Sequence, residues 1–333
     1  MADTTFNTNS AEAVKLWAKL LYYELPRELY FSKWFKENDQ NCIIEVKRDL
    51  QKNPGDRIRF TLLRKLSGAG VLGDAKQEGS EESMVYQSDD VTINQRRNAV
   101  RLAGRMSERL TQFDQRMDAK NVLRTWMGET IDDDIFTALA LSPATSRTLY
   151  AGQRTAINLL QAGDTMTAPL IDRLLGTAKK ATPKLWPVKV DGMDLFVLLL
   201  HTDVSFDLRQ NFSTTAVAWA SIQQYANERG KSNPLFLGAL GFWGGQCIIH
   251  EHEKVPTGTD AGAGGNLAWA SNMFLARQAL CFAWGAPPEA WEQLFDYGAQ
   301  PGFCIGAIWG AKKSVYNAVD HGYIELRTVR TNL

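Results

Sequence analysis

The chain has 333 residues, of which 44% are hydrophobic and 22% charged, the composition of an ordinary globular protein large enough for two lobes. Its 37 basic and 37 acidic residues give a formal net charge of zero, which argues against a dedicated DNA- or RNA-binding protein. The N-terminus lacks the basic start and apolar core of a signal peptide, and the longest apolar run, residues 195–200, is too short to cross a bilayer. Four scattered cysteines without a secretory context indicate reduced thiols in a protein that folds in a cytoplasm: Cys42, Cys247, Cys281 and Cys304.

The N-terminal region predicts a polar arm over residues 1–10 and a short helix over residues 11–24 that Pro26 ends. This region is also rich in aromatic residues: Trp17, Tyr22, Tyr23, Tyr30, Phe31, Trp34 and Phe35. Two interpretations stay open. The rings pack on the core of their own subunit, or they clamp a neighbour, since aromatic residues are enriched at the centres of interfaces.

A long hairpin is predicted next, because apolar and polar residues alternate over residues 57–62 and again over residues 85–96. The linker over residues 67–83 is rich in glycine and acidic residues, so we expect the hairpin to project and to need a partner. Gly68, Gly70 and Gly73 form a G-x-G-x-x-G pattern in this linker. The helix that a dinucleotide site requires does not follow it, and the nearby anions would repel phosphate. We therefore do not interpret the pattern as a nucleotide site.

Residues 107–140 predict one helix of roughly 50 Å, which we expect to brace the hairpin against the rest of the molecule. Ser107 is expected to cap it and Pro143 to stop it. Its apolar residues recur at helical spacing: Leu110, Phe113, Met117, Val122, Trp126 and Ile131, with Leu123, Met127, Ile135 and Leu139 beside them. Asp132, Asp133 and Asp134 point in different directions round such a helix, so they indicate salt-bridge partners or a solvated turn.

The remaining chain mixes helices and strands without a regular βαβ alternation, which predicts an α+β fold. We expect helices over residues 167–180, from 201, over 214–229 and over 267–284, the last one buried and ended by Gly285 and the prolines after it. Strands are expected on either side of Asp191-Gly192, over residues 247–251, near 305–309 and over 323–329.

The strongest candidate for a metal site is the pair His250 and His252, which share a face of a predicted strand that starts at Cys247. A metal there would need a third ligand from far away, such as His201 or His321. The alternative is two polar residues at an exposed strand end. No nucleophile triad and no Walker-type phosphate loop occurs in the sequence, so it predicts no active site and no cofactor.

The arm, hairpin, long helix and mixed lobe follow one another in an order that is found in a known family of proteins. The chain resembles the major capsid proteins of tailed double-stranded DNA bacteriophages with the Hong Kong 97-type fold, and among them a podophage-like coat family. The segments that carry the resemblance keep their order from Gly55 onward: GDRIRFTLLRKLSGAGVLGD, VTINQRRNAVRLAGRMSE, IDDDIFTAL, NPLFLGALGFWGG and KKSVYNAVDHGYI.

The resemblance implies five structural regions along the chain. It gives an N-terminal arm (1–40), an extended loop with its flanks (41–105), a peripheral domain with the spine helix (106–165), an axial domain (166–305) and a last strand that returns to the peripheral domain (306–333). The loop would lie over an adjacent subunit. The residues expected at contacts between subunits are Trp17, Tyr22, Tyr23, Phe31, Trp34, Arg57, Arg59, Arg64, Gly68, Gly70, Gly73, Glu81, Glu82, Arg96 and Arg97.

The function that the resemblance implies is a structural shell protein, not an enzyme. Hexamers and pentamers of the chain would form an icosahedral virion capsid in the host cytoplasm, around double-stranded DNA held by non-specific contacts, without a membrane. Portal, scaffolding and decoration proteins are the implied partners, with the scaffold as a separate protein and no covalent cross-link assigned. Two alternatives stay open: a cellular nanocompartment shell of the same fold, and a metal-dependent enzyme that uses His250 and His252.

Overall fold

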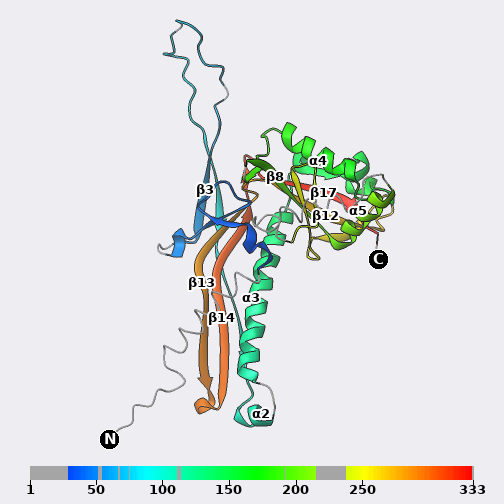
Figure 1. The fold of residues 1–333 in the computed structure, drawn as a ribbon. Coiled ribbons are helices and arrows are strands. Elements are labelled where there is room, and N and C mark those ends of the chain that lie inside the picture. Colours follow the sequence, from blue (N-terminus) through cyan, green and yellow to red (C-terminus); the bar gives the residue numbers. More distant parts are fainter. Residues whose placement is uncertain are drawn as a thin grey trace.

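The structure is a computed structural model that describes residues 29–51, 55–66, 68–74, 76–110, 114–190, 192–214 and 238–331. The predicted helix over residues 11–24 and nearly all of the one over 214–229 lie outside these residues. Among the described helices, none is long and apolar enough to cross a membrane. Two sheets, a long helix and a projecting hairpin make up the fold (Figure 1).

The first sheet is built on a long antiparallel pair, β13 (Leu280–Phe295) and β14 (Gln300–Lys313). It has five strands in the order β1 (Phe35–Glu37), β2 (Ile44–Lys47), β13, β14 and β5 (Asn94–Arg101). The helix α3 (Gln115–Ala140) lies along β14 for much of its length (Figure 1). This sheet and helix form the elongated half of the molecule.

The predicted long helix is two helices, and its start was predicted wrongly. Ser107 lies inside a short helix, α2 (Arg105–Leu110), and α3 begins after Asp114. The Asp114 carboxylate accepts the backbone N–H groups of Arg116 and Met117, which are left without partners in the first turn of a helix.

The buried face of α3 differs from the predicted stripe at its N-terminal end. It consists of Ala119, Leu123, Met127, Gly128, Ile131, Asp132, Ile135, Phe136 and Leu139. The side chains of Met117 and Val122 are exposed, because these positions lie off the buried face of α3, and Leu110, in α2, is exposed as well. The C-terminal end follows the prediction, since the helix ends at Ala140, three residues before Pro143.

The projecting hairpin consists of β3 (Arg57–Leu63) and β4 (Tyr86–Thr92), which pair antiparallel over their full lengths (Figure 1). The predicted second strand, residues 85–96, is split at Ile93. Its second part continues as β5 and joins the first sheet beside β14. Ile58, Phe60 and Val91 anchor the base of the hairpin on Cys281 and Ala283 of β13.

The second sheet forms a separate mixed lobe with α4 (Ala168–Lys180) and α5 (Thr202–Thr214). Six of its eight strands follow the order β6 (Thr148–Tyr150), β17 (Tyr323–Val329), β12 (Leu267–Leu275), β8 (Met193–Leu200), β10 (Cys247–Glu251) and β9 (Gly241–Trp243). Two more strands pair at its margins, β11 (Thr257–Ala261) with β12 and β7 (Val188–Val190) with β8. The predictions for α4, β7–β8, β10 and β17 are confirmed.

The predicted helix over residues 267–284 is wrong. This stretch forms β12 and the start of β13, joined by a turn in which Gln278 has a φ of 53°. Both strands are buried on both faces, so the sequence shows no alternation and a continuous apolar run is compatible with a helix or a strand. Gly285 does not end the element either, because β13 continues through it and the register shifts between Trp284 and Glu289.

The two sheets divide the chain differently from the implied domains. Strand β13, expected in the axial domain 166–305, pairs with β2 and β14 of the first sheet. Strand β17, expected to return to the peripheral domain, pairs with β12 in the second sheet.

Short elements fill the connections: 3₁₀ helices η1 (Tyr30–Trp34), η2 (Asp49–Gln51), η3 (Thr145–Arg147), η4 (Ala151–Gln153), η5 (Ile157–Leu159) and η7 (Asp296–Gly298), and the two-stranded pair β15 (Val315–Tyr316) and β16 (Val319–Asp320).

Candidate assembly surfaces

The outer half of the hairpin exposes an unusual number of apolar side chains. They are Leu63, Leu66, Leu72, Met84, Val85 and Tyr86, and Leu72 is 89% exposed. The hairpin stands away from both lobes in Figure 1, so nothing in the described part of the subunit covers these side chains. Exposed apolar patches of this kind mark interaction sites in soluble proteins.

The same hairpin tip is acidic. Between Leu66 and Val85 the sequence has four acidic residues, Asp74, Glu78, Glu81 and Glu82, and one basic residue, Lys76. Two of the carboxylates also shape the tip, because Glu82 accepts the N–H of Gly68 at 2.7 Å and Glu81 accepts the N–H of Gly79 at 2.8 Å. We call residues 66–85 the hairpin tip.

Two predicted glycines have a conformational role in the tip. Gly70 has a φ of 72° and Gly73 a φ of 64°, values that residues with a Cβ rarely adopt. These glycines turn the chain at the tip, and they lead into a turn and an irregular segment, with no helix that could bind a nucleotide phosphate. The arginines predicted at the base of the hairpin are exposed: Arg57, Arg59 and Arg64, with Arg59 paired to Asp90 at 2.7 Å.

The opposite end of the subunit is basic, and it also exposes apolar side chains. Residues 101–124, which include α2 and the first half of α3, contain six basic and three acidic residues. The apolar side chains of Met106, Leu110, Met117 and Val122 are exposed in the same segment. We call the described residues of this segment, 101–110 and 114–124, the distal surface. Figure 1 places α2 at the far end of the molecule from the hairpin tip.

Two arginines predicted at contacts, Arg96 and Arg97, lie on β5 with different surroundings. Arg96 bonds Asp134 of α3 at 2.6 Å and lies against the ring of Trp309, so it holds α3 to the sheet. Arg97 is exposed, and its Cβ lies near Gly306 of β14. The structure therefore brings Arg96 into an internal contact and leaves Arg97 available at the surface.

The aromatic residues of the N-terminal region are described only from Tyr30 onward, so Trp17, Tyr22 and Tyr23 lie outside the described residues. Phe31 and Trp34 are buried in their own subunit, at 0% and 2% exposure. Phe31 lies 4.8 Å from Phe136 of α3, and Trp34 lies 5.2 Å from His250 of β10, between ring centroids. Phe31 and Trp34 therefore pack on the core of their own subunit, the first of the two interpretations, and a clamp on a neighbour by the other aromatic residues stays a prediction.

The three aspartates of α3 point to three partners, as their consecutive positions predict. Asp133 pairs with Lys254 at 2.7 Å, and Asp134 with Arg96 and the indole N–H of Trp309. Asp132 was not predicted to be buried, yet it accepts the backbone N–H groups of Tyr30 and Phe31 at 2.9 and 3.4 Å. Burial raises the pKa of the Asp132 carboxyl to about 6, although both hydrogen bonds act in the opposite direction.

The two candidate metal ligands, His250 and His252, both face η1. The Nδ1 atom of His250 lies 3.4 Å from the Lys33 ammonium, and the His252 ring lies 4.3 Å from the ring of Tyr30. Burial lowers the pKa of Lys33 to about 8 and also lowers the pKa of His252. Within the described residues no group of three or more metal-ligating side chains comes together, so the structure does not bring His201 or His321 to this pair. The histidines are packing residues at the junction between η1, α3 and β10.

Sequence reasoning missed the distal surface. It interpreted Leu110, Met117 and Val122 as core residues because they have helical spacing. The signal that could have found it is the density of arginines between Arg101 and Arg124, which sits beside those apolar residues and is unusual for a buried face.

A long helix beside an elongated sheet, a projecting hairpin and a separate mixed lobe define a shell-forming coat subunit. Solved structures agree with this class. The capsid of Ralstonia phage GP4 superposes with a TM-score of 0.85 and 27% identity, over 99% of this chain and 96% of that one. The capsid of cyanophage Pam1 does so with a TM-score of 0.77 and 23% identity, over the whole of both chains. The fold is of the Hong Kong 97 type, α+β as predicted.

A family model described as phage capsid protein matches residues 5–163 and 139–330, so this chain belongs to the phage capsid protein family. The major capsid protein of Pseudomonas phage KPP25 is 28% identical, over 97% of this chain and 96% of that protein. The chain is a phage major capsid protein, a structural component of capsid shells and not an enzyme.

The nanocompartment alternative is represented among similar structures. The SrpI encapsulin of Synechococcus elongatus superposes with a TM-score of 0.54 and 11% identity, which shows a common fold alone. The phage capsid proteins are more similar in both sequence and structure.

Proposed function

We propose that copies of this chain assemble as hexamers and pentamers into an icosahedral shell around packaged double-stranded DNA, in the cytoplasm of the host. Portal, scaffolding and decoration proteins are the proposed partners of the shell. The zero net charge of the subunit supports a wall that holds DNA without strong binding, because affinity for DNA depends on excess basic charge.

The contact that we propose between neighbours joins the hairpin tip of one subunit to the distal surface of the next. The observation that carries it is the complementarity of the two ends. The tip has three more acidic than basic residues, the distal surface has three more basic than acidic residues, and both expose apolar side chains. Opposite charges steer the two ends together, and burial of the apolar residues supplies most of the binding free energy.

This contact is heterologous, since two different surfaces meet. A heterologous contact repeats from one copy to the next and closes into a ring, as in a hexamer or a pentamer, when the rotation allows it. The proposed contact residues of the tip are Gly68, Gly70, Gly73, Glu81 and Glu82, together with the apolar residues of both ends. Outside these two surfaces, Arg57, Arg59, Arg64, Arg97, Trp17, Tyr22 and Tyr23 stay proposed for other contacts between subunits. Phe31, Trp34 and Arg96 are dropped because their partners are internal.

We further propose that the two sheets mark the domains. The peripheral domain would contain the five-stranded sheet with α2 and α3, and the axial domain would contain the eight-stranded sheet with α4 and α5. Strand β13 then belongs to the peripheral domain and β17 to the axial domain, which follows their hydrogen-bonded partners. This division replaces the boundaries at residues 166 and 306.

A charge-reversal pair tests the proposed contact. Asp74→Lys with Glu78→Lys on the tip, or Arg105→Glu with Arg109→Glu on the distal surface, should each reduce assembly, because like charges then meet. These side chains are exposed and make no internal ion pair in the described structure, so the subunit should still fold. The chain that carries all four changes should recover assembly, measured by light scattering and electron microscopy.

The matched control is Lys179→Glu with Lys184→Glu, which makes the same charge change away from both ends. We expect it to assemble as the wild type does. Failure of the four-fold variant to recover, while both pairs still fold, would contradict a contact between these two surfaces.

A further inference from the structure

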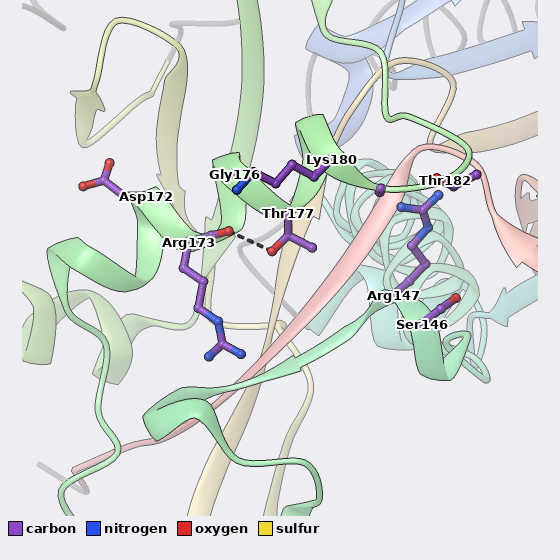
Figure 2. A pocket seen from close by; sticks show the side chains of 9 residues that line it. Ser146, Arg147, Asp172, Arg173, Gly176, Thr177, Lys180 and Thr182 are labelled. Carbon is purple, nitrogen blue, oxygen red and sulfur yellow. Dashed lines mark hydrogen bonds between the residues drawn. The ribbon is translucent and has the colours of Figure 1, made fainter.

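The mixed lobe contains an open cavity of about 540 Å³ that the assembly contact does not use. One wall is a face of α4 with Arg173, Gly176, Thr177 and Lys180, and the other is η3 with Arg147 (Figure 2). Ala181 and Thr182 close one side. A Cβ on Gly176 would meet nothing within 4 Å, so the face of α4 is open at its centre.

Three cations line this cavity, and none of them has a carboxylate within ion-pair distance in the described structure. Arg147 donates to the carbonyl of Pro183 and Arg173 to the carbonyl of Tyr150, while Lys180 bonds no described residue. Figure 2 shows the ammonium of Lys180 beside Gly176 and the guanidinium of Arg147 directed toward Thr182. Among the described residues, no carboxylate forms an ion pair with any of the three cations.

Arg147 is the residue of the lining that points most strongly to a ligand. It is only 2% exposed, and its Nε–H has no acceptor. Burial lowers the pKa of its guanidinium. The negative charge of Asp320 raises the pKa of the guanidinium in part. Asp320 already forms a buried ion pair with Lys313 at 3.0 Å. Burial of a guanidinium that shares its nearby carboxylate with Lys313 is unfavourable, and an anion in the cavity would offset that cost.

The one acidic residue of the lining does not compensate these cations. Asp172 is exposed, and its carboxylate accepts the indole N–H of Trp243 at 2.8 Å. The remaining polar groups suit an oxyanion. Ser146 and Thr182 carry hydroxyl groups that donate hydrogen bonds, and arginine binds phosphate oxygens with two parallel N–H groups.

We propose that the cavity between α4 and η3 binds a small polyphosphate, with its phosphate groups held by Arg147, Arg173 and Lys180. A chain of phosphates fits the observations better than a single ion does, because the three cations all line the cavity, yet in Figure 2 their charged ends point in different directions and do not converge on one point. The site lies on the mixed lobe, so its existence is independent of the proposed contact between hairpin tip and distal surface.

Calorimetric titration of the full-length, unassembled protein with sodium tripolyphosphate tests the site. The reference is a titration with sodium chloride at the same ionic strength. Arg173→Gln with Lys180→Gln changes two cations that are not buried, so the fold should be kept, and affinity should fall at least tenfold. The matched control, Lys179→Gln with Lys184→Gln, removes the same charge next to the cavity and should bind as the wild type does.

The proposal would be overturned if titration with tripolyphosphate released the same heat of binding as titration with sodium chloride. It would also be overturned if the two double variants lost the same affinity for tripolyphosphate. The second result would indicate a diffuse basic surface and not a site. A short DNA duplex is the competing probe, and we expect weak competition because a rigid rod can place few phosphates in the cavity. Displacement of tripolyphosphate by duplex at a lower phosphate concentration would assign the surface to DNA and would also overturn the proposal.

Discussion

The carboxylate of Asp132, in the middle of the long helix α3, accepts the backbone N–H of Tyr30, which lies 102 residues earlier in the chain. The same carboxylate accepts the N–H of Phe31, so one side chain caps the first turn of η1. Rings on both sides close the contact, since Tyr30 lies against His252 and Phe31 against Phe136. A single buried carboxylate thus fixes the N-terminal end of the described chain to the helix that braces the subunit.

This contact makes stability depend on pH. The pKa of Asp132 is about 6 in the folded protein and about 3.8 when unperturbed, so the folded chain binds this proton more tightly than the unfolded chain does. Its contribution to the free energy of unfolding is largest below about pH 4 and is lost as the pH rises through 6, about 3 kcal/mol in all. Asp132→Asn has no such proton. Its unfolding free energy should therefore rise relative to the wild type by about that amount between pH 4 and 7.

Urea denaturation of both proteins across this pH range measures the difference. Asn121→Ala, at an exposed position of the same helix, changes no ionisable group, so it is the control and should leave the difference constant with pH. A constant difference for Asp132→Asn as well would show that this carboxyl is not protonated near pH 6.

The buried ion pair of Lys313 and Asp320 connects three segments. Lys313 also donates to the carbonyl of Ser142, and Asp320 also accepts the N–H of Ala144, so the pair holds the chain just after α3. Lys313→Met should lower the free energy of unfolding by about 3–5 kcal/mol, because it leaves Asp320 buried without a counter-charge.

Adding Asp320→Asn should recover part of that loss, since neither side chain is then charged and the amide oxygen still accepts a hydrogen bond. Lys36→Ala removes an ion pair to Asp39 that is half exposed, and it should change the denaturation curve very little. Equal effects of Lys313→Met and Lys36→Ala would mean that the buried pair adds no more than a surface pair.

Two glycines should respond oppositely to alanine. A Cβ on Gly310 of β14 would lie 2.3 Å from the backbone oxygen of Thr92, where β4 ends, so one of the two strands must move. Overpacking of this kind costs about 1–3 kcal/mol. Gly176 lies inside α4 with open space around it, so Gly176→Ala should stabilise by up to about 1 kcal/mol through helix propensity. Thermal denaturation of the two variants should shift in opposite directions.

Removal of the hairpin tip should separate folding from assembly. A chain in which residues 68–83 are deleted should fold, because this segment contributes nothing to the hydrophobic cores of the described residues. It should assemble poorly, because the proposed contact is lost. Calorimetry should give a cooperative unfolding transition, while electron microscopy should give few closed shells. Loss of the cooperative transition would instead assign the tip a role in folding.

Much of the fold could be predicted where a local signal exists. The Thr167-Ala168-Pro169 signal for the start of α4 and the Asp191-Gly192 signal for the hairpin of β7 and β8 each consist of a few neighbouring residues. The stretch over residues 267–284 failed because a strand buried on both faces and a buried helix have the same pattern. Its strand state is set by pairing of β12 with β17 and of β13 with β2, two strands that are distant in sequence, and with β14.

The functional surfaces were predicted only in part, for a related reason. The hairpin tip is polar and glycine-rich, which is a local property, so its exposure followed from composition. The exposure of Met117 and the burial of Asp132 depend on which side of α3 faces the sheet, and a helical stripe alone does not give that orientation. The cavity at Arg147 has no local signal, because η3 and α4 meet only in the folded lobe.

The five-stranded sheet also determines at what point of its synthesis the subunit can finish folding. Strand β2 needs β13 beside it, and Ile44 pairs with Leu280, more than two hundred residues later. Strand β5 likewise waits for β14. A nascent chain on the ribosome therefore cannot complete this sheet until most of its length has emerged, so unfinished chains lack the scaffold that holds α3 and the hairpin in place. A chain that ends before β14 therefore lacks a central strand of this sheet.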